Sequence, residues 1–162
     1  MLNSVYYKEF DIRWNDLDAN RHLANSSYIV FMAHTRMSFL GENGFGQKQM
    51  QQYNLGPIVF HEHVYYFREV MAGSVIRVTM ELGGMSEDGM FYEFRHNFYD
   101  ENGRNMTYGN MLGSWIDLKT RKLTALPKEL LAIVDKLHHT DDFRILTKED
   151  TRKEAKFPKD LT

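Results

Sequence analysis

The chain has 162 residues, of which 43% are hydrophobic and 14% aromatic, and this predicts one soluble globular domain. It has no cysteine, which excludes disulfides, a thiol nucleophile and cysteine-ligated zinc or iron–sulfur clusters. The 20 basic and 22 acidic residues give a net charge of −2 without a basic block, so we expect no nucleic-acid partner. The longest strictly apolar run, Tyr28 to Ala33, is too short to span a bilayer, and the N-terminus lacks the pattern of a signal peptide. We therefore expect a cytoplasmic protein with no membrane span.

An alternating pattern from Val5 to Trp14 predicts a half-buried strand, with the apolar residues at positions 6, 10, 12 and 14 on its buried side. The polar residues 15–20 would end this strand, because they contain too many Asp and Asn to continue a ladder.

Residues 26–41 predict a helix, for which Ser26 and Ser27 are candidate caps. Its apolar side chains cover most of the circumference, which is typical of a helix that is buried on nearly all sides. Glycines at positions 41 and 44 would end it.

The middle of the chain predicts an antiparallel meander of strands. A long strand from Pro57 to about Met71 is followed by one around residues 79–82, one at 91–99 and one that ends at about residue 118. Asp-Gly at 88–89 and Asn-Gly at 102–103 are hairpin signals. The glycines at 83, 84, 109 and 113 predict bulges or close approaches of the backbone.

A short amphipathic helix is expected after Pro127, and 12 of the 23 residues from 140 to 162 are charged. We therefore divide the chain into a domain of residues 1–139 and a charged C-terminal tail of residues 140–162 that packs weakly. One buried helix, an N-terminal strand and a long sheet predict an α+β fold in which the sheet wraps around the helix, and this arrangement suits the hotdog fold. Long exposed strand edges favour pairing with a second copy.

Five polar side chains, Asp16, Asp18, Asn20, His22 and Asn25, lie within ten residues between the first strand and the helix. The start of a helix offers unpaired N–H groups and a positive dipole end, which would stabilise a developing oxyanion. A carboxylate there could be a general base or a nucleophile, an Asn could orient water, and a His could shuttle protons. Asp and Asn before a helix are also common caps and turn formers, so a purely structural role stays open.

The stretch WNDLDANRHLANSSY, residues 14–28, resembles the signature of hotdog acyl thioesterases. It is similar to the D-x-D-x-x-G-H-x-N-N-x-x-Y pattern of the 4-hydroxybenzoyl-CoA thioesterase-like group, and it meets the D-L-D-x-N-x-H-x-x-N pattern of acyl-ACP thioesterases residue by residue. Residues 66–69 (YFRE), followed by Gly73, resemble the end of the family's second strand and its turn, and residues 126–130 (LPKEL) resemble its usual C-terminal close. The resemblance covers about residues 5–137.

This resemblance implies hydrolysis of a thioester between an acyl group and a pantetheine thiol, in acyl-CoA or acyl-ACP, without a cofactor. It implies catalytic roles for Asp18, Asn20, His22 and Glu69, with the N-terminus of the buried helix polarising the carbonyl. Whether Asp18 attacks directly or activates water stays open. The candidate substrate-binding residues on the helix are Asn25, Ser26, Tyr28, Phe31 and Met32. The single-domain length favours acyl-CoA as the substrate, whereas the motif favours an acyl carrier protein. For the assembly, we expect a homodimer or a dimer of dimers.

Two departures from the family pattern bear on the mechanism. Arg21 stands where most CoA-type members have Gly. Ala33 stands where many relatives have a helix Glu, so a mechanism that uses a helix carboxylate is not expected, and Arg36 has no obvious partner.

Two other classes of function stay open: a hotdog enoyl-thioester hydratase, and a non-catalytic hotdog module that binds acyl thioesters or scaffolds a complex. The hydratases carry a His-containing motif on the helix that this chain lacks, whereas the missing helix Glu favours the binding module. His61 and His63 would face the same way on a strand and form at most half of a metal site, so we expect no metal.

Overall fold

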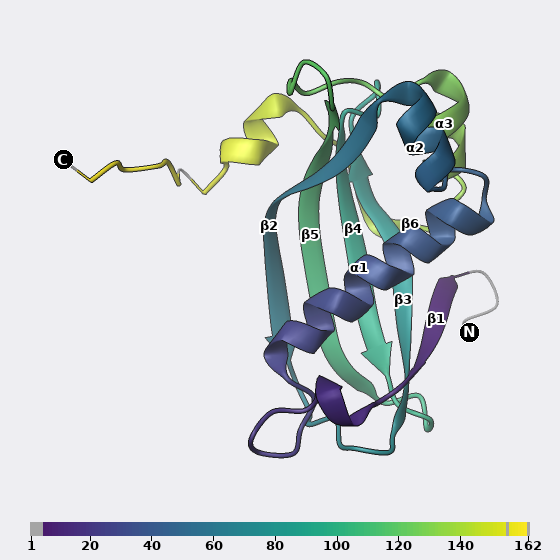
Figure 1. Ribbon diagram of the computed structural model, residues 1–162, viewed down its shortest axis with the longest axis vertical. Helices are drawn as coiled ribbons and strands as arrows, with labels where there is room; N and C mark the ends of the chain where they lie inside the picture. Colours follow the sequence, from purple (N-terminus) through teal and green to yellow (C-terminus); the bar gives the residue numbers. More distant parts are fainter. Residues whose placement is uncertain (1–4, 155, 162) are drawn as a thin grey trace.

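A six-stranded sheet and one long helix that lies across it form most of the molecule (Figure 1). The computed structural model describes residues 5–154 and 156–161. The strands are β1 (Tyr6–Asp11), β2 (Leu55–Tyr66), β3 (Val75–Met85), β4 (Phe91–Tyr99), β5 (Asn105–Asp117) and β6 (His139–Ile145). The helices are α1 (Asn25–Glu42), α2 (Gln47–Tyr53) and α3 (Lys128–Val134), with short 3-10 turns at Trp14–Asp16 and Lys148–Arg152.

The main sheet has the strand order β1-β3-β4-β5-β2, and each neighbouring pair in it is antiparallel. β6 pairs with β3 in parallel. Both predicted hairpins are present, and their glycines, Gly89 and Gly103, have φ angles of 68° and 75°. These angles lie in the left-handed region that glycine adopts without strain. The predicted α+β hotdog fold, with the sheet around one central helix, is confirmed.

Helix α1 has one buried face and one exposed face. It begins at Asn25 after Ala24, for which no capping side-chain hydrogen bond is present among the described residues, so the prediction of a serine cap is wrong. The inward face includes Phe31 and Met32, whereas Val30 on the other face is 56% exposed. The prediction of burial on nearly all sides is therefore wrong, because the described chain places no element over the outer face.

The inner face of α1 packs on the sheet in two clusters. The cluster near the start of the helix includes Phe31, Met32 and Phe98, and the cluster near its end includes Phe39 and Trp115. A Cβ atom at Gly109 of β5 would overlap the sulfur of Met32, so this glycine lets the helix lie close to the sheet. Such a close approach is what the glycine inside the strand predicted.

Both ends of the chain differ from the sequence prediction. The first strand ends at Asp11, and Trp14 lies in a 3-10 turn with 89% of its surface exposed. Residues 140–145 belong to β6, and Leu146 is only 2% exposed, so the expectation that the C-terminal tail packs weakly is wrong for this part. No helix in the described part of the chain is both long and apolar enough to cross a bilayer.

Candidate active site

Asp16 fixes the loop between β1 and α1 at both of its ends. Its carboxylate accepts hydrogen bonds from the backbone N–H of Arg13 (2.9 Å) and from the Arg13 guanidinium (3.0 and 3.1 Å). Its carbonyl oxygen accepts hydrogen bonds from the N–H of Ala24 (2.8 Å) and the hydroxyl of Ser27 (2.9 Å). The Arg13 hydrogen bonds hold the pKa of Asp16 below its usual value, so the carboxylate stays ionised at neutral pH. Asp16 therefore has a structural role.

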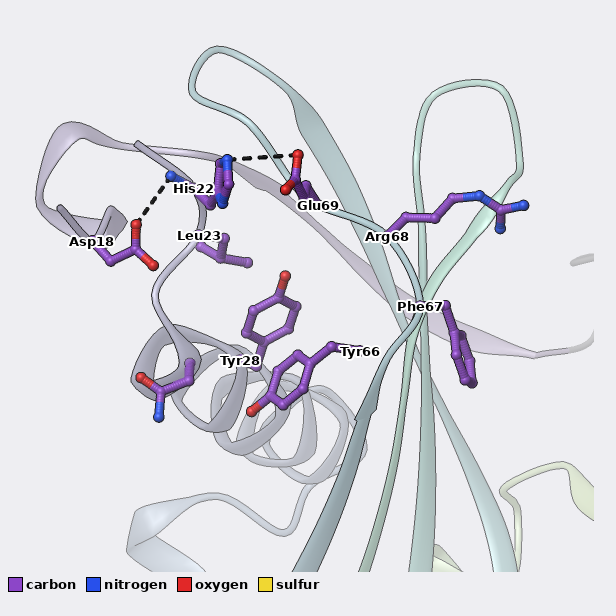
Figure 2. A pocket seen from close by; sticks show the side chains of 9 residues that line it. Asp18, His22, Leu23, Tyr28, Tyr66, Phe67, Arg68 and Glu69 are labelled. Carbon is purple, nitrogen blue, oxygen red and sulfur yellow. Dashed lines mark hydrogen bonds and ion pairs between the residues drawn. The ribbon is translucent and has the colours of Figure 1, made fainter. Parts of the chain in front are cut away.

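Asp18 lies inside this loop and folds it into a tight turn. Its Oδ1 atom accepts hydrogen bonds from the backbone N–H groups of Asn20 (2.8 Å) and His22 (3.2 Å; Figure 2). The N–H of Asp18 donates in return to the carbonyl of His22 at 2.9 Å. Arg21 has a φ of 63°, in the left-handed region, which is the physical reason why a glycine would suit this position.

A short pairing between two loops brings His22 beside Glu69. The N–H of Leu23 donates to the carbonyl of Val70 at 2.8 Å, and His22 bridges to Met71. The Nε2 atom of His22 consequently lies 3.5 Å from Oε2 of Glu69 (Figure 2). The structure therefore brings together Asp18, His22 and Glu69, three of the four residues predicted to be catalytic.

These three side chains border a pocket of about 410 Å³ at the start of α1. Tyr28 rises into it from the helix, and its ring centroid lies 5.0 Å from that of Tyr66 at the end of β2 (Figure 2). Burial raises the pKa of Tyr28, so its hydroxyl is protonated at neutral pH. The full lining is Asp18, His22, Leu23, Asn25, Tyr28, Tyr66, Phe67, Arg68 and Glu69.

Several predicted site residues lie outside this pocket. Asn20 and Ser26 are exposed and do not line it, and Asn20 reaches Asp18 only through its backbone. Phe31 and Met32 are 2% and 0% exposed and belong to the core. Asn25 and Tyr28 do line the pocket.

The prediction from sequence missed four of the lining residues: Leu23, Tyr66, Phe67 and Arg68. Tyr66 stands in the short motif at the end of β2, where only the acidic residue was selected as catalytic. It faces Tyr28 because the side chains of a strand alternate, and Val64, two residues earlier, packs against the cluster that contains Tyr28.

A second cavity of about 210 Å³ lies farther along α1, between the helix and the sheet. Arg36 is the one charged residue in its lining, which is otherwise apolar or aromatic. The lining residues are Ala33, Arg36, Met37, Leu40, Pro57, Val59, Tyr92, Phe94, Met111 and Trp115. Neither Phe31 nor Met32 borders this cavity, although both were expected to bind substrate.

Arg36 has partners that the sequence did not reveal. Its Nη2 atom lies 3.4 Å from Oε1 of Glu62 on β2, and its Nη1 atom lies 3.4 Å from Nε2 of His96 on β4. Burial lowers the pKa of Arg36, and the nearby Glu62 opposes this shift. Nδ1 of His96 lies 2.7 Å from the carbonyl of Thr79, so Nδ1–H donates to this carbonyl and Nε2 can accept from Arg36.

The rings of His61 and His63 stack at 4.8 Å on β2. Within residues 5–154 and 156–161, no three His, Asp or Glu side chains are grouped so that they could hold a metal ion.

Similar structures have the same fold at low sequence identity. A hypothetical protein from Staphylococcus aureus in complex with CoA superposes with a TM-score of 0.76 at 16% identity, over 93% of each chain. A putative oleoyl thioesterase from Lactobacillus plantarum superposes with a TM-score of 0.77 at 14% identity, over 90% of this chain and 53% of that one. A 1,4-dihydroxy-2-naphthoyl-CoA thioesterase from Synechocystis superposes with a TM-score of 0.73 at 13% identity, over 84% and 99% of the two chains.

Comparison with curated proteins finds no match. The family model described as the thioesterase-like superfamily matches residues 12–134, which include the whole loop around Asp18, helix α1 and strands β2 to β5. The chain therefore belongs to the thioesterase-like superfamily.

Proposed function

We propose that the protein hydrolyses the thioester of an acyl-CoA to a carboxylic acid and a thiol. Membership of the superfamily supports thioester hydrolysis in general terms. The observation that carries the proposal is the pocket that Asp18, His22 and Glu69 line together with Asn25 and Tyr28 of the first turn of α1. The CoA in the complex of the similar Staphylococcus aureus protein favours CoA over a carrier protein.

In the proposed reaction, the thioester carbonyl lies at the first turn of α1. No side chain of the described residues caps this turn, so its N–H groups and the positive end of the helix dipole can stabilise the oxyanion. A water oxygen attacks the carbonyl carbon, Asp18 takes its proton, and the C–S bond breaks as the thiolate leaves and is protonated. His22, oriented by Glu69, carries this proton from Asp18 to the sulfur of the leaving thiolate. Direct attack by Asp18 is the alternative route.

The acyl part of the substrate needs an apolar site, and the second cavity along α1 supplies one. We propose that two copies of the chain pair along β2, which forms one end of the main sheet and is twelve residues long. An antiparallel pair of these strands would place the pocket at the end of one β2 near Pro57 and Val59 of the partner. The thioester would then bind on one copy and the acyl chain beside the other.

One observation favours a second candidate, a module that binds acyl thioesters without hydrolysing them. Oδ1 of Asp18 is already occupied by two backbone hydrogen bonds, which would explain this residue by the turn alone. A thiol-release assay separates the candidates, with short, long and aromatic acyl-CoAs as substrates and Asp18→Asn as the variant. Turnover that collapses in the variant supports the hydrolase, whereas binding without turnover supports the module. Hydration of an enoyl-CoA by the wild type would favour the hydratase.

A further inference from the structure

The C-terminal segment forms the wall of a separate pocket of about 320 Å³. This segment is held on the molecule by a buried side chain and an ion pair. Leu146 packs with Phe91 and Leu112 of the sheet, and the guanidinium of Arg144 pairs both with Glu93 on β4 and with Asp150 of the segment itself. The 3-10 turn that follows, Lys148–Arg152, is thereby fixed beside β2 (at the left in Figure 1).

Four cationic side chains line this pocket: Lys148, Arg152, Lys153 and Lys156. None of them forms an ion pair with another residue of the described chain; Arg152 instead lies over the ring of Phe157 at 5.2 Å. Glu154 is the one carboxylate in the lining, and it lies 3.4 Å from Nε2 of His63. The pocket therefore has a strong excess of positive charge.

The opposite wall of the pocket is aromatic. Phe60, at a β-bulge of β2, is 38% exposed, and its ring centroid lies 6.4 Å from that of Phe91. Beside them, Nδ1 of His61 is buried and has no hydrogen-bond partner among the described residues. A buried polar atom without a partner costs free energy unless a ligand or water satisfies it.

We propose that this pocket binds a nucleotide with two or more phosphates. Lysine and arginine bind phosphate oxygens through charge-assisted hydrogen bonds. An aromatic face stacks on a nucleobase, and Nδ1 of His61 can exchange a hydrogen bond with the polar edge of the base or the sugar. Two sources share this chemistry: a free nucleoside diphosphate or triphosphate, and the nucleotide end of CoA. Nucleotide binding at this pocket does not depend on the proposed hydrolysis, because none of these residues borders the pocket at Asp18; only the choice between the two sources rests on it.

The test is calorimetric titration of the full chain with ADP, pyrophosphate and CoA. Lys148→Ala/Lys153→Ala removes two of the cations, and Lys119→Ala/Lys122→Ala, in the exposed turn after β5, is the matched control. We expect the first variant to raise the Kd of ADP about tenfold or more, and the control to leave it unchanged. Phe60→Ala should weaken binding of ADP more than binding of pyrophosphate.

The two sources are separated by hydrolysis of acyl-CoA and of acyl-pantetheine. If Lys148→Ala/Lys153→Ala raises the KM for acyl-CoA but not the KM for acyl-pantetheine, the pocket binds the nucleotide end of CoA. Unchanged KM values together with weaker ADP binding assign it to a free nucleotide. Three results would overturn the proposal: no binding of ADP or CoA to the wild type, equal ADP affinity in both double variants, or pyrophosphate binding as tight as that of ADP. Binding of an acidic carrier protein by a wild type that binds neither nucleotide would also overturn it.

Discussion

The backbone N–H of His22 donates a hydrogen bond of 3.2 Å to Oδ1 of Asp18, so the carboxylate that we propose as catalytic also shapes its own loop. The two roles use different atoms, since the described residues make no hydrogen bond to Oδ2. An Asp18→Asn variant keeps Oδ1 and loses the charge, whereas Asp18→Ala loses both. The two variants therefore separate catalysis from folding of the loop.

We expect Asp18→Asn to lower kcat/KM for an acyl-CoA by about 100-fold or more with little change in Tm, because only the base is lost. Asp18→Ala should lose the same activity and, in addition, about 1 kcal/mol of stability. Steady-state thiol release and thermal unfolding measure the two effects. If Asp18→Asn retained full activity, Asp18 would be a turn former only.

The buried pair of Arg36 and Glu62 predicts a large stability effect. Their side chains are 11% and 16% exposed, so Glu62→Ala leaves a guanidinium without its carboxylate in a poorly solvated place. We expect this variant to lose about 3 kcal/mol in the free energy of unfolding, measured by urea denaturation. The double variant Arg36→Met/Glu62→Leu should recover most of the loss. A loss below about 1 kcal/mol in the single variant would show that water solvates the pair.

The buried imidazole of His96 should make the free energy of unfolding depend on pH. Burial, reinforced by the nearby charge of Arg36, lowers the pKa of His96 to about 3, below its ordinary value of 6.5. The unfolded chain therefore takes up a proton near pH 6.5 that the folded chain does not. Above pH 6.5 this difference does not reduce the free energy of unfolding. Below pH 6.5 the free energy of unfolding falls by about 1.4 kcal/mol per pH unit, until the pH reaches the pKa of His96 in the folded protein.

The measurement for His96 is urea unfolding between pH 7.5 and 5, where most carboxylates remain ionised. His96→Asn keeps a donor for the carbonyl of Thr79 but does not titrate, so it should be less stable at neutral pH and have a flatter pH dependence. The same slope in both proteins would mean that His96 becomes protonated in the folded state.

The burial of Leu146 predicts that the C-terminal segment, residues 140–154, is firmly attached to the sheet. Its side chain is buried against the sheet, whereas its neighbour Ile145 is 56% exposed. Leu146→Ala should cost about 2–4 kcal/mol and expose the segment to proteases, and Ile145→Ala should change stability by less than about 0.5 kcal/mol. Urea denaturation and limited proteolysis give the two readings. Equal effects of the two substitutions would show that Leu146 does not attach the C-terminal segment to the sheet.

The proposed dimer predicts that a charge introduced into its interface weakens the association of the two copies. Val30 and Met37 on the outer face of α1 and Val59 on β2 are exposed apolar side chains. Met37→Glu should weaken association about tenfold or more, because a carboxylate would be buried in the interface. Leu161→Glu, at an exposed position near the C-terminus, is the control. Light scattering over a concentration series measures both, and a wild type that remains monomeric would refute the pairing.

Local patterns in the sequence predicted the fold well. Asp-Gly and Asn-Gly pairs fix hairpins through the φ angles that they allow, and α1 stood out by its long apolar stretch. The outer face of α1 was misjudged, because apolar residues that cover a helix indicate burial but do not say whether this chain or another one covers them. Helix α2 was missed because, in its seven residues, only Met50 is buried.

The candidate site was predicted only in part, because its members come from distant segments. The pattern around Asp18 and His22 is local and could be recognised, whereas Glu69 reaches His22 through a pairing of loops far apart in the chain. The partners of Arg36 depend on the register of β2 and β4 relative to the helix, which no local pattern encodes. β6 was missed because its charges suggested a solvated tail, although Arg95 and Asp142 pair on the sheet surface at 2.6 Å.

The two ends of the sheet differ in a way that limits how the protein can assemble. At one end, β1 and β6 share the edge of β3 and run in opposite directions, so this border is broken into strands of six and seven residues. Short, interrupted borders are poor templates for another strand. At the other end, β2 offers twelve residues in one direction. Growth of the sheet by copies of this chain would therefore be self-limiting: after two β2 strands pair in the proposed dimer, only the broken borders remain at the two ends of the joint sheet, and these do not support a fibre.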